Sequence, residues 1–193
     1  MKKLTKIKLI FGLGNPGKEF KNTPHNFGRD LVESYITKTK QKEVEGEYFI
    51  AKRLSGIFFV IPQLYMNENG KALKEALNKF KLNLENILII HDEADLPFLR
   101  VKISFNGGSS MHKGVESVYK ECGRNVWRFR IGIQYLKERV KAEKIILKKL
   151  PKNLILKWNK AKKLFAHVID KLEKEPIEKL NLPNNFFINN QSL

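Results

Sequence analysis

The stretch that most constrains the fold is residues 7–28, where an apolar run meets a glycine-rich break. Residues 7–13 are mostly apolar, as expected of a strand that a sheet buries on both faces. The run stops at residues 14–17, Gly-Asn-Pro-Gly, because Pro16 has no N–H to donate to a strand ladder and the glycines allow a turn. A short polar loop then leads to His25, just before a helical pattern begins. This strand–loop–helix unit predicts a ligand crevice at the carboxyl end of the strand.

Several common chemistries are disfavoured by the same stretch and its surroundings. The Gly-x-Gly at residues 12–14 lacks the third glycine that opens the helix of a dinucleotide site, since Pro16 and Gly17 stand there. No Ser or Cys occupies a nucleophile elbow, so water is the natural nucleophile. Neighbouring polar residues of one strand or turn rarely converge on a metal, so neither a metal nor a cofactor is predicted for the group His91, Asp92, Glu93 and Asp95.

Hydrophobic periodicity predicts that strands and helices alternate along most of the chain. Strand-like runs cover residues 48–54, 57–62, 86–90, 100–105 and 127–134. Helical spacing covers residues 27–38, the segment from 70 to 80, and residues 115–122 and 153–173. We expect an α/β fold with a mixed twisted β-sheet flanked by helices on both faces. Residues 1–193 are interpreted as a single domain, with a loose C-terminal tail at residues 176–193.

The charge of the chain points to a polyanionic partner. There are 37 Lys and Arg against 20 Asp and Glu, which gives a formal net charge of +17. This excess is more than solubility needs. The alternative is a lysine-rich composition with solvated basic faces, because bulk charge indicates attraction and not a specific site.

Cysteine usage and hydropathy bear on the compartment. Cys122 is the only cysteine, so no intrachain disulfide can form and a reducing environment fits. Lys6 and Lys8 interrupt the apolar start of the chain, which also lacks the cleavage site of a signal peptide. No apolar run approaches the roughly 18 residues that a membrane span needs. We therefore expect a cytoplasmic protein without a membrane segment.

His25 and Asp92 are the candidate catalytic pair. Each follows a different predicted strand, so the topology can bring them together across the crevice. A carboxylate that orients a histidine ring fixes its tautomer and stabilises its protonated form, which suits a general base acting on water. The alternative is that both residues only begin or end their elements. Asn15 and Asn67 stand in turns, where an amide can hold a carbonyl group or simply favour the turn.

A longer pattern gives these residues a context. Residues 12–28 contain Gly-Leu-Gly-Asn-Pro-Gly and then Thr-x-His-Asn-x-Gly. Further motifs follow in order: Met66-Asn67-x-x-Gly70, His91-Asp92-Glu93-x-Asp95-Leu96-Pro97, Gly107-Gly108 with His112-x-Gly114, and Arg128-x-Arg130-Ile131-Gly132-Ile133. Together they resemble the bacterial-type peptidyl-tRNA hydrolases. The resemblance covers residues 7–134 and is loose beyond them.

The resemblance implies cleavage of the ester bond between a peptide and the 3′ end of tRNA, with peptidyl-tRNA as the partner, no cofactor and a monomeric enzyme. His25 would be the base that activates water, Asp92 would orient it, and Asn15 would position the substrate near the ester. The other substrate-binding residues would be Phe20, Met66, Asn67 and Lys113. The tRNA phosphates would meet Lys102 and Arg130, and the basic segment 135–163 would form a lid or a further tRNA surface.

Lys113 is the main departure from the family pattern, which has Asn at this position. A cation beside His25 would lower the pKa of the ring and make it a weaker base. An ammonium could equally stabilise the developing oxyanion better than an amide does. The sequence leaves both interpretations open. Smaller departures are Phe20, Pro24 and Ser104, where the family has Tyr, Arg and a basic residue.

Two other functions stay open on sequence alone. The change at Lys113 could have produced an RNA-binding protein without turnover, although the presence of both His25 and Asp92 argues against that. A different hydrolase, such as an amidase or a nucleotide esterase, could use the same pair. Cleavage that occurs only when a peptide is esterified to tRNA would separate the three functions.

Overall fold

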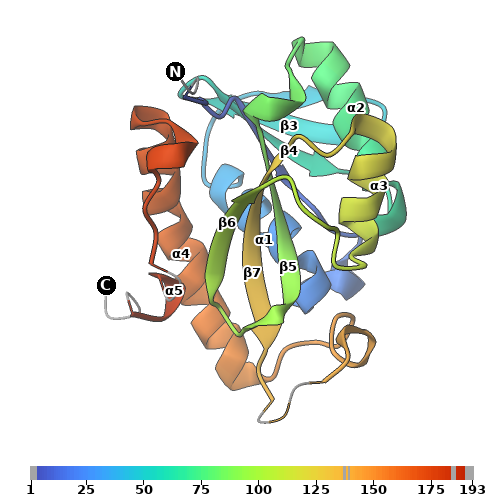
Figure 1. The fold of residues 1–193 in the computed structure, drawn as a ribbon, viewed down its shortest axis with the longest axis vertical. Coiled ribbons are helices and arrows are strands. Elements are labelled where there is room, and N and C mark those ends of the chain that lie inside the picture. The colour runs from blue at the N-terminus through green and yellow to red at the C-terminus, as the bar shows by residue number, and fades with distance from the viewer. Residues whose placement is uncertain (1–3, 137, 139, 184–185, 190–193) are drawn as a thin grey trace.

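A seven-stranded mixed sheet forms the centre of the molecule (Figure 1). The computed structural model describes residues 4–136, 138, 140–183 and 186–189. The strands are β1 Leu9–Gly12, β2 Glu43–Glu45, β3 Phe49–Leu54, β4 Ile57–Pro62, β5 Ile87–Pro97, β6 Val101–Phe105 and β7 Trp127–Gln134. Their order across the sheet is β2-β3-β4-β1-β5-β7-β6. The four strands β4, β1, β5 and β7 run parallel, whereas β3 pairs antiparallel with β2 and β4, and β6 with β7.

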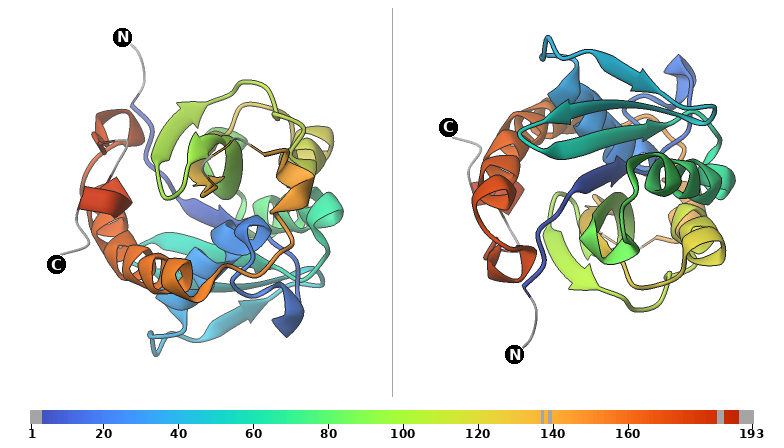
Figure 2. Two further views of the ribbon diagram at one scale, coloured as in Figure 1. Left: turned by 90° about the horizontal axis from the view of Figure 1, so that it is seen from below. Right: turned by 90° about the horizontal axis from the view of Figure 1, so that it is seen from above.

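Helices cover both faces of this sheet, which confirms the predicted fold class (Figure 2). The α-helices are α1 Phe27–Ile36, α2 Asn69–Phe80, α3 Lys113–Cys122, α4 Lys152–Lys174 and the short α5 Phe186–Asn189. Single 3₁₀ turns lie at Lys18–Phe20, Pro24–Asn26, Met66–Glu68, Leu84–Asn86, Ala142–Lys144 and Ile177–Lys179. Among the described helices, none is both long enough and apolar enough to cross a membrane.

The hydrophobic core divides into two clusters, one on each face of the sheet. Successive side chains of a strand point to opposite faces, and the central strands supply both clusters. Ile10 and Ile90 belong to the cluster that α1 and α4 close, whereas Leu9 and Ile89 belong to the one that α2 and α3 close. Burial on both faces explains why β1 and the first half of β5 are almost continuously apolar.

Strand β5 is longer than the periodicity predicts. The sequence indicates a strand over residues 86–90, whereas β5 continues to Pro97. The additional residues pair with β7, and His91 lies opposite Arg130. Polar side chains are tolerated there because they find partners: Glu93 Oε2 accepts a hydrogen bond from Arg130 Nε at 2.9 Å and lies 2.8 Å from Nη2 of the same guanidinium, as an ion pair. The polar residues that follow Ile90 therefore lie within β5, and not in a loop after the strand.

Part of the C-terminal tail packs against the hydrophobic core. The sequence predicts loop or partial disorder for residues 176–193, but the Phe187 side chain is fully buried and its ring lies 5.9 Å from that of Phe129. Burial of apolar area offsets the entropy of ordering such a segment. Residues 184–185 and 190–193 fall outside the described residues.

Helix α1 begins in direct contact with the sheet backbone. The Cα of Gly28 approaches the carbonyls of Ile90 and Leu13 so closely that any Cβ would collide with them. The backbone N–H of Arg29 donates to the same Leu13 carbonyl at 2.9 Å. These contacts fix the start of α1, and with it the turn at residues 24–26, against β1 and β5.

Candidate functional site

A pocket of about 760 Å³ opens beside the end of β1, the middle of β5 and the start of α3. It brings together all the predicted catalytic and substrate-binding residues. Its lining consists of Asn15, Phe20, His25, Tyr65, Met66, Asn67, Asp92, Glu93, Ala94, Ser110, Met111, His112, Lys113, Ala142, Glu143, Ile146 and Leu147. The pocket lies at the crevice that the first strand–loop–helix unit predicts.

His25 and Asp92 are buried side by side in this pocket. The Nδ1 atom of His25 lies 3.0 Å from Asp92 Oδ1, and the two side chains are 8% and 4% exposed. The 3₁₀ turn Pro24–Asn26 carries His25, whose backbone N–H donates to the Ile146 carbonyl at 2.9 Å. Asp92 lies within β5, where pairing with β7 fixes its position. Main-chain hydrogen bonds therefore hold both side chains at hydrogen-bonding distance.

Burial and charge act on this pair in opposite directions. Burial alone lowers the pKa of His25, but the charge of Asp92 and its hydrogen bond to the ring outweigh that effect and raise the pKa above its ordinary value. Lys113 contributes a smaller lowering. Burial alone raises the pKa of Asp92, but His25 and His112 hold this pKa far below its ordinary range. Asp92 is thus ionised at neutral pH and stabilises the tautomer with the proton on Nδ1 of His25.

A second histidine shares the carboxylate. The Nε2 atom of His112 lies 2.7 Å from the same Asp92 Oδ1. Its Nδ1 atom accepts hydrogen bonds from the backbone N–H groups of Gly114 and Val115, at 3.1 and 3.3 Å, so His112 is the N-cap of α3. The sequence motifs contain His112 but give it no role. Its position directly before a helical pattern is the signal that could have identified it as a cap.

These three side chains could also be considered as metal ligands, because one candidate ligand atom of each lies within 4.8 Å of the others. The proton positions argue against such a use. The Nδ1 atom of His112 already accepts two N–H groups, so Nε2 carries the proton. Coordination through Nε2 would require loss of that proton or of the helix cap. The cluster of His25, Asp92 and His112 is therefore suited to holding protons.

Asn15 presents its amide in a single orientation. Its Oδ1 atom accepts a hydrogen bond from the backbone N–H of Met66 at 2.8 Å, which leaves the NH₂ group as the donor in the pocket. Asn26 holds the Asn15 backbone from the other side: its Oδ1 accepts from the Asn15 N–H at 2.8 Å and its Nδ2 donates to the Asn15 carbonyl at 2.9 Å. A donor fixed in this way can meet a carbonyl group or an oxyanion.

Apolar and aromatic side chains form the rim of the pocket. The rings of Phe20 and Tyr65 pack edge to face with centroids 6.3 Å apart. Met111 is 86% exposed at the opening, and residues 142–147 of the predicted lid segment supply another part of the lining. The exposed polar residues that line the pocket include Asn67, Ser110, Lys113 and Glu143. This arrangement offers an apolar surface next to the buried polar cluster.

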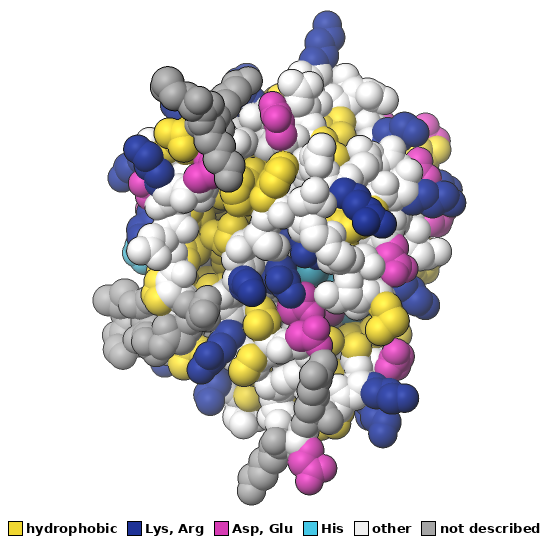
Figure 3. Space-filling view, in the orientation of Figure 1, with side chains coloured by type: hydrophobic (Ala, Val, Ile, Leu, Met, Phe, Trp, Pro, Cys, Tyr) yellow, Lys and Arg dark blue, Asp and Glu magenta, His cyan; other side chains and the backbone are white. Residues whose placement is uncertain are grey.

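Lys102 and Arg130 are neighbours on adjacent strands and do not line the pocket. Lys102 of β6 pairs with Arg130 of β7 in antiparallel register, so their side chains leave the same face of the sheet. Arg130 is hydrogen-bonded to Glu93, which does line the pocket. Figure 3 shows basic side chains grouped over this part of the sheet, beside acidic side chains and a partly visible histidine. A basic surface therefore borders the pocket.

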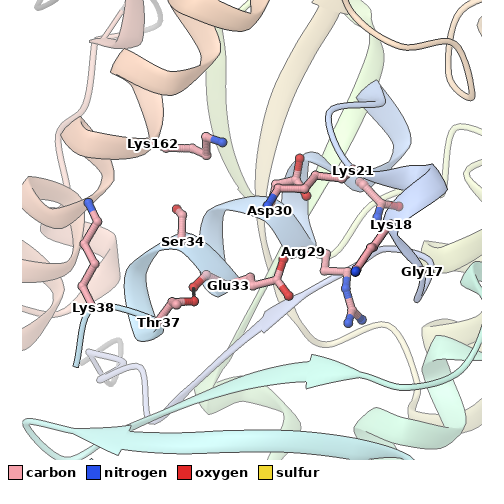
Figure 4. Close-up of a pocket in the computed structure, with 11 residues that line it drawn as sticks. Gly17, Lys18, Lys21, Arg29, Asp30, Glu33, Ser34, Thr37, Lys38 and Lys162 are labelled. Atoms are coloured by element: carbon pink, nitrogen blue, oxygen red, sulfur yellow. Dashed lines mark hydrogen bonds between the residues drawn. The ribbon is translucent and has the colours of Figure 1, made fainter. Parts of the chain in front are cut away.

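A second cavity of about 610 Å³ lies along the outer side of α1 (Figure 4). Its lining includes the cations Lys18, Lys21, Lys38 and Lys162. Asp30 is buried between them, and burial raises the pKa of Asp30 to about 6, although the Asn22 N–H and the Lys162 charge oppose the change. The described lining contains no histidine or cysteine, whereas the first pocket holds His25 and His112 beside Asp92.

The comparisons with known proteins agree on one family. Residues 9–190 match the sequence profile of the family described as Peptidyl-tRNA hydrolase. The protein of that name from Phytoplasma australiense is 37% identical over 134 residues, which cover 66% of this chain and 71% of that protein. The protein of that name from Lactobacillus gasseri is 37% identical over 136 residues, which cover 67% and 73%.

A solved structure gives the same result for the fold. A crystal structure of a point mutant of peptidyl-tRNA hydrolase from Acinetobacter baumannii has a TM-score of 0.75 to this chain, with 28% sequence identity. The superposition covers 90% of each chain. The profile match includes every residue that lines the pocket, from Asn15 to Leu147.

Proposed function

The chain belongs to the peptidyl-tRNA hydrolase family and hydrolyses peptidyl-tRNA, and we propose that it does so with a water molecule that His25 activates. The bond cleaved is the ester between the peptide and the 3′ end of tRNA, and free tRNA returns to translation. The observation that carries this mechanism is the buried His25–Asp92 pair within a pocket of about 760 Å³.

His25 acts as base through its outer ring nitrogen. Because Nδ1–H donates to Asp92, Nε2 is the nitrogen that accepts a proton from water. The activated water attacks the ester carbonyl, and the proton then passes from His25 to the departing 3′ oxygen. Asp92 remains ionised throughout and stabilises the imidazolium that forms.

The developing oxyanion is stabilised by Asn15 and Lys113. The Asn15 NH₂ group is oriented by the bond between its Oδ1 and the Met66 backbone. Lys113 lies at the start of α3 in the same pocket and adds a positive charge. Its lowering effect on the pKa of His25 is outweighed by Asp92, which supports a base that still functions beside a cation.

The remaining predicted residues hold the two halves of the substrate. Phe20, Met66 and Asn67 contact the peptide, because they line the pocket beside the apolar rim. Lys102 and Arg130 contact tRNA phosphates on the bordering basic surface. The proposal includes a monomeric protein that acts in the cytoplasm, and light scattering on the purified protein tests the monomer.

Incubation with N-acyl-aminoacyl-tRNA tests the function and the base together. We expect wild type to release the acyl-amino acid and to spare free aminoacyl-tRNA. His25→Ala should be slower by about 10²- to 10⁴-fold, as is usual when a general base is removed. His167→Asn is the control, since His167 is exposed on α4. Full activity of His25→Ala would refute the mechanism, and tRNA binding without release would favour a binding protein.

A further inference from the structure

Asp92 is unusual in that a single carboxylate oxygen serves two histidines. Its Oδ1 atom lies 3.0 Å from His25 Nδ1 and 2.7 Å from His112 Nε2, so the shorter contact is with the residue that is not the proposed base. The two imidazole rings are close to each other, with centroids 4.8 Å apart. The hydrogen bonds from His112 and from His25 therefore compete for the same carboxylate oxygen, Asp92 Oδ1.

The tautomer of His112 is fixed by helix α3. A ring nitrogen that accepts hydrogen bonds has no proton, and His112 Nδ1 accepts from the backbone N–H groups of Gly114 and Val115. The proton of the neutral ring is consequently on Nε2, where it faces Asp92. Adding a proton to Nδ1 would set an N–H against two backbone N–H groups and break the cap. His112 is thus a donor that does not exchange roles with His25.

We propose that His112 is a positioning residue: its ring, fixed in one tautomer because it caps α3, donates the second hydrogen bond to Asp92 and limits how strongly Asp92 acts on His25. This inference rests on the proposed role of His25 as the base. A hydrogen bond donated to a carboxylate disperses its negative charge, so less of that charge is available to a neighbouring imidazolium. Without His112, Asp92 would hold a proton on His25 more firmly.

The other charged groups near His25 do not act through a hydrogen bond to Asp92. Lys113 lowers the pKa of His25, as His112 does in this proposal, but through its own charge. The remaining titratable side chains around His25 are Tyr65, Glu93 and Glu143, which line the pocket, and His91, whose ring contacts that of His112. Glu93 is already paired with Arg130. His112 is therefore the residue whose removal changes the environment of Asp92 most directly.

Two substitutions separate the cap from the second hydrogen bond. Asn is a favourable N-cap residue, but its side chain is too short to cap α3 and reach Asp92 at once, so His112→Asn removes only the donor. His112→Ala removes both. We expect the stability of His112→Asn to stay near that of wild type, and His112→Ala to unfold at a lower temperature. His167→Asn on α4 makes the same chemical change at an exposed site.

The decisive measurement is the titration of His25, followed by NMR of the imidazole in the intact protein. In His112→Asn the midpoint should rise by about 0.5 to 1 pH unit. The acid limb of the kcat/KM profile should move by the same amount, with a larger loss at pH 6 than at pH 8. His167→Asn should leave both unchanged.

An unchanged or lower His25 midpoint in His112→Asn would overturn the inference, and so would a loss of activity equal at every pH. The NMR titration needs no turnover, so it gives a result even if the hydrolase assay fails. Failure of wild type to release an acyl-amino acid would instead count against the proposed function.

Discussion

In the proposed mechanism, the chemistry of the pocket depends on Asp92, which is buried, ionised and bonded to two rings. The two rings that donate to it must themselves be held in place. The turn before α1 holds His25, and the N-terminus of α3 holds His112. A substitution that moves either ring should therefore change how the proposed base, His25, titrates.

Lys113→Asn tests the main departure from the motif pattern described in the sequence analysis. Lys113 lowers the pKa of His25, so its loss should let that pKa rise and move the acid limb of kcat/KM to higher pH. Asn can still donate to an oxyanion, so the rate at pH 8 should change by no more than about tenfold. Lys120→Asn is the control on the exposed side of α3. A gain of several hundredfold would mean that Lys113 inhibits the natural enzyme.

Single residues were predictable where a local pattern identified them. His25 and Asp92 both follow apolar runs, and runs of that kind place their ends at one edge of a sheet. His112 was not predictable as a donor, because its partner lies 20 positions earlier and its proton position depends on a cap. Arg130 was expected to meet phosphate, and its bond to Glu93 depends on a strand pairing that periodicity does not reveal.

At the scale of elements, the buried strands and amphipathic helices follow from periodicity, and the exceptions have physical reasons. The prediction for β5 ends at residue 90 because polar residues follow, yet β7 supplies them with partners. Strand β2 was not predicted, since Glu43 and Glu45 alternate with a single Val there. Charged side chains are common on such edge strands, where they discourage pairing with other molecules.

The segment that follows β7 is held by one of its lysines. The Lys149 ammonium donates to the carbonyls of Lys18 and Lys21, at 3.3 and 2.6 Å, and so secures the loop that carries Phe20. Lys149→Met should lower kcat/KM several-fold at every salt concentration, because the loop that carries Phe20 and leads to His25 loosens. Lys148→Met, its neighbour, should alter only KM and its salt dependence. Equal kinetic effects of the two variants would show that both lysines act only as charges toward tRNA.

At the scale of the whole molecule, folding buries the carboxyl group of Asp30 on the side of the sheet that α1 and α4 cover. Asp30 is 4% exposed, and its pKa of about 6 lies above the ordinary value of 3.8. The folded state therefore favours the neutral acid. The resulting stabilisation is complete below the ordinary pKa and is lost as the pH rises through about 6.

Asp30→Asn should prevent the loss of stability above pH 6. The amide oxygen still accepts from the Asn22 N–H, but the side chain carries no charge. We expect the variant to exceed wild type in stability at pH 8 by as much as about 3 kcal/mol, and to match it near pH 4. Urea denaturation at the two pH values measures the difference. Asp170→Asn, at an exposed position of α4, is the control. A stability difference independent of pH would contradict the expectation.

The hydrogen bond from the backbone N–H of His25 to the Ile146 carbonyl has a consequence for protein engineering. It joins the proposed base to the pocket wall through main-chain atoms, so exchange of the Ile146 or Leu147 side chain does not remove it. Leu147 is 56% exposed and lines the pocket, which makes it open to many replacements. Libraries at this wall can therefore explore new acyl groups while the catalytic apparatus keeps its geometry. The acyl-group selectivity of the pocket can therefore change without a change in reactivity, although the pocket wall and His25 are joined by a hydrogen bond.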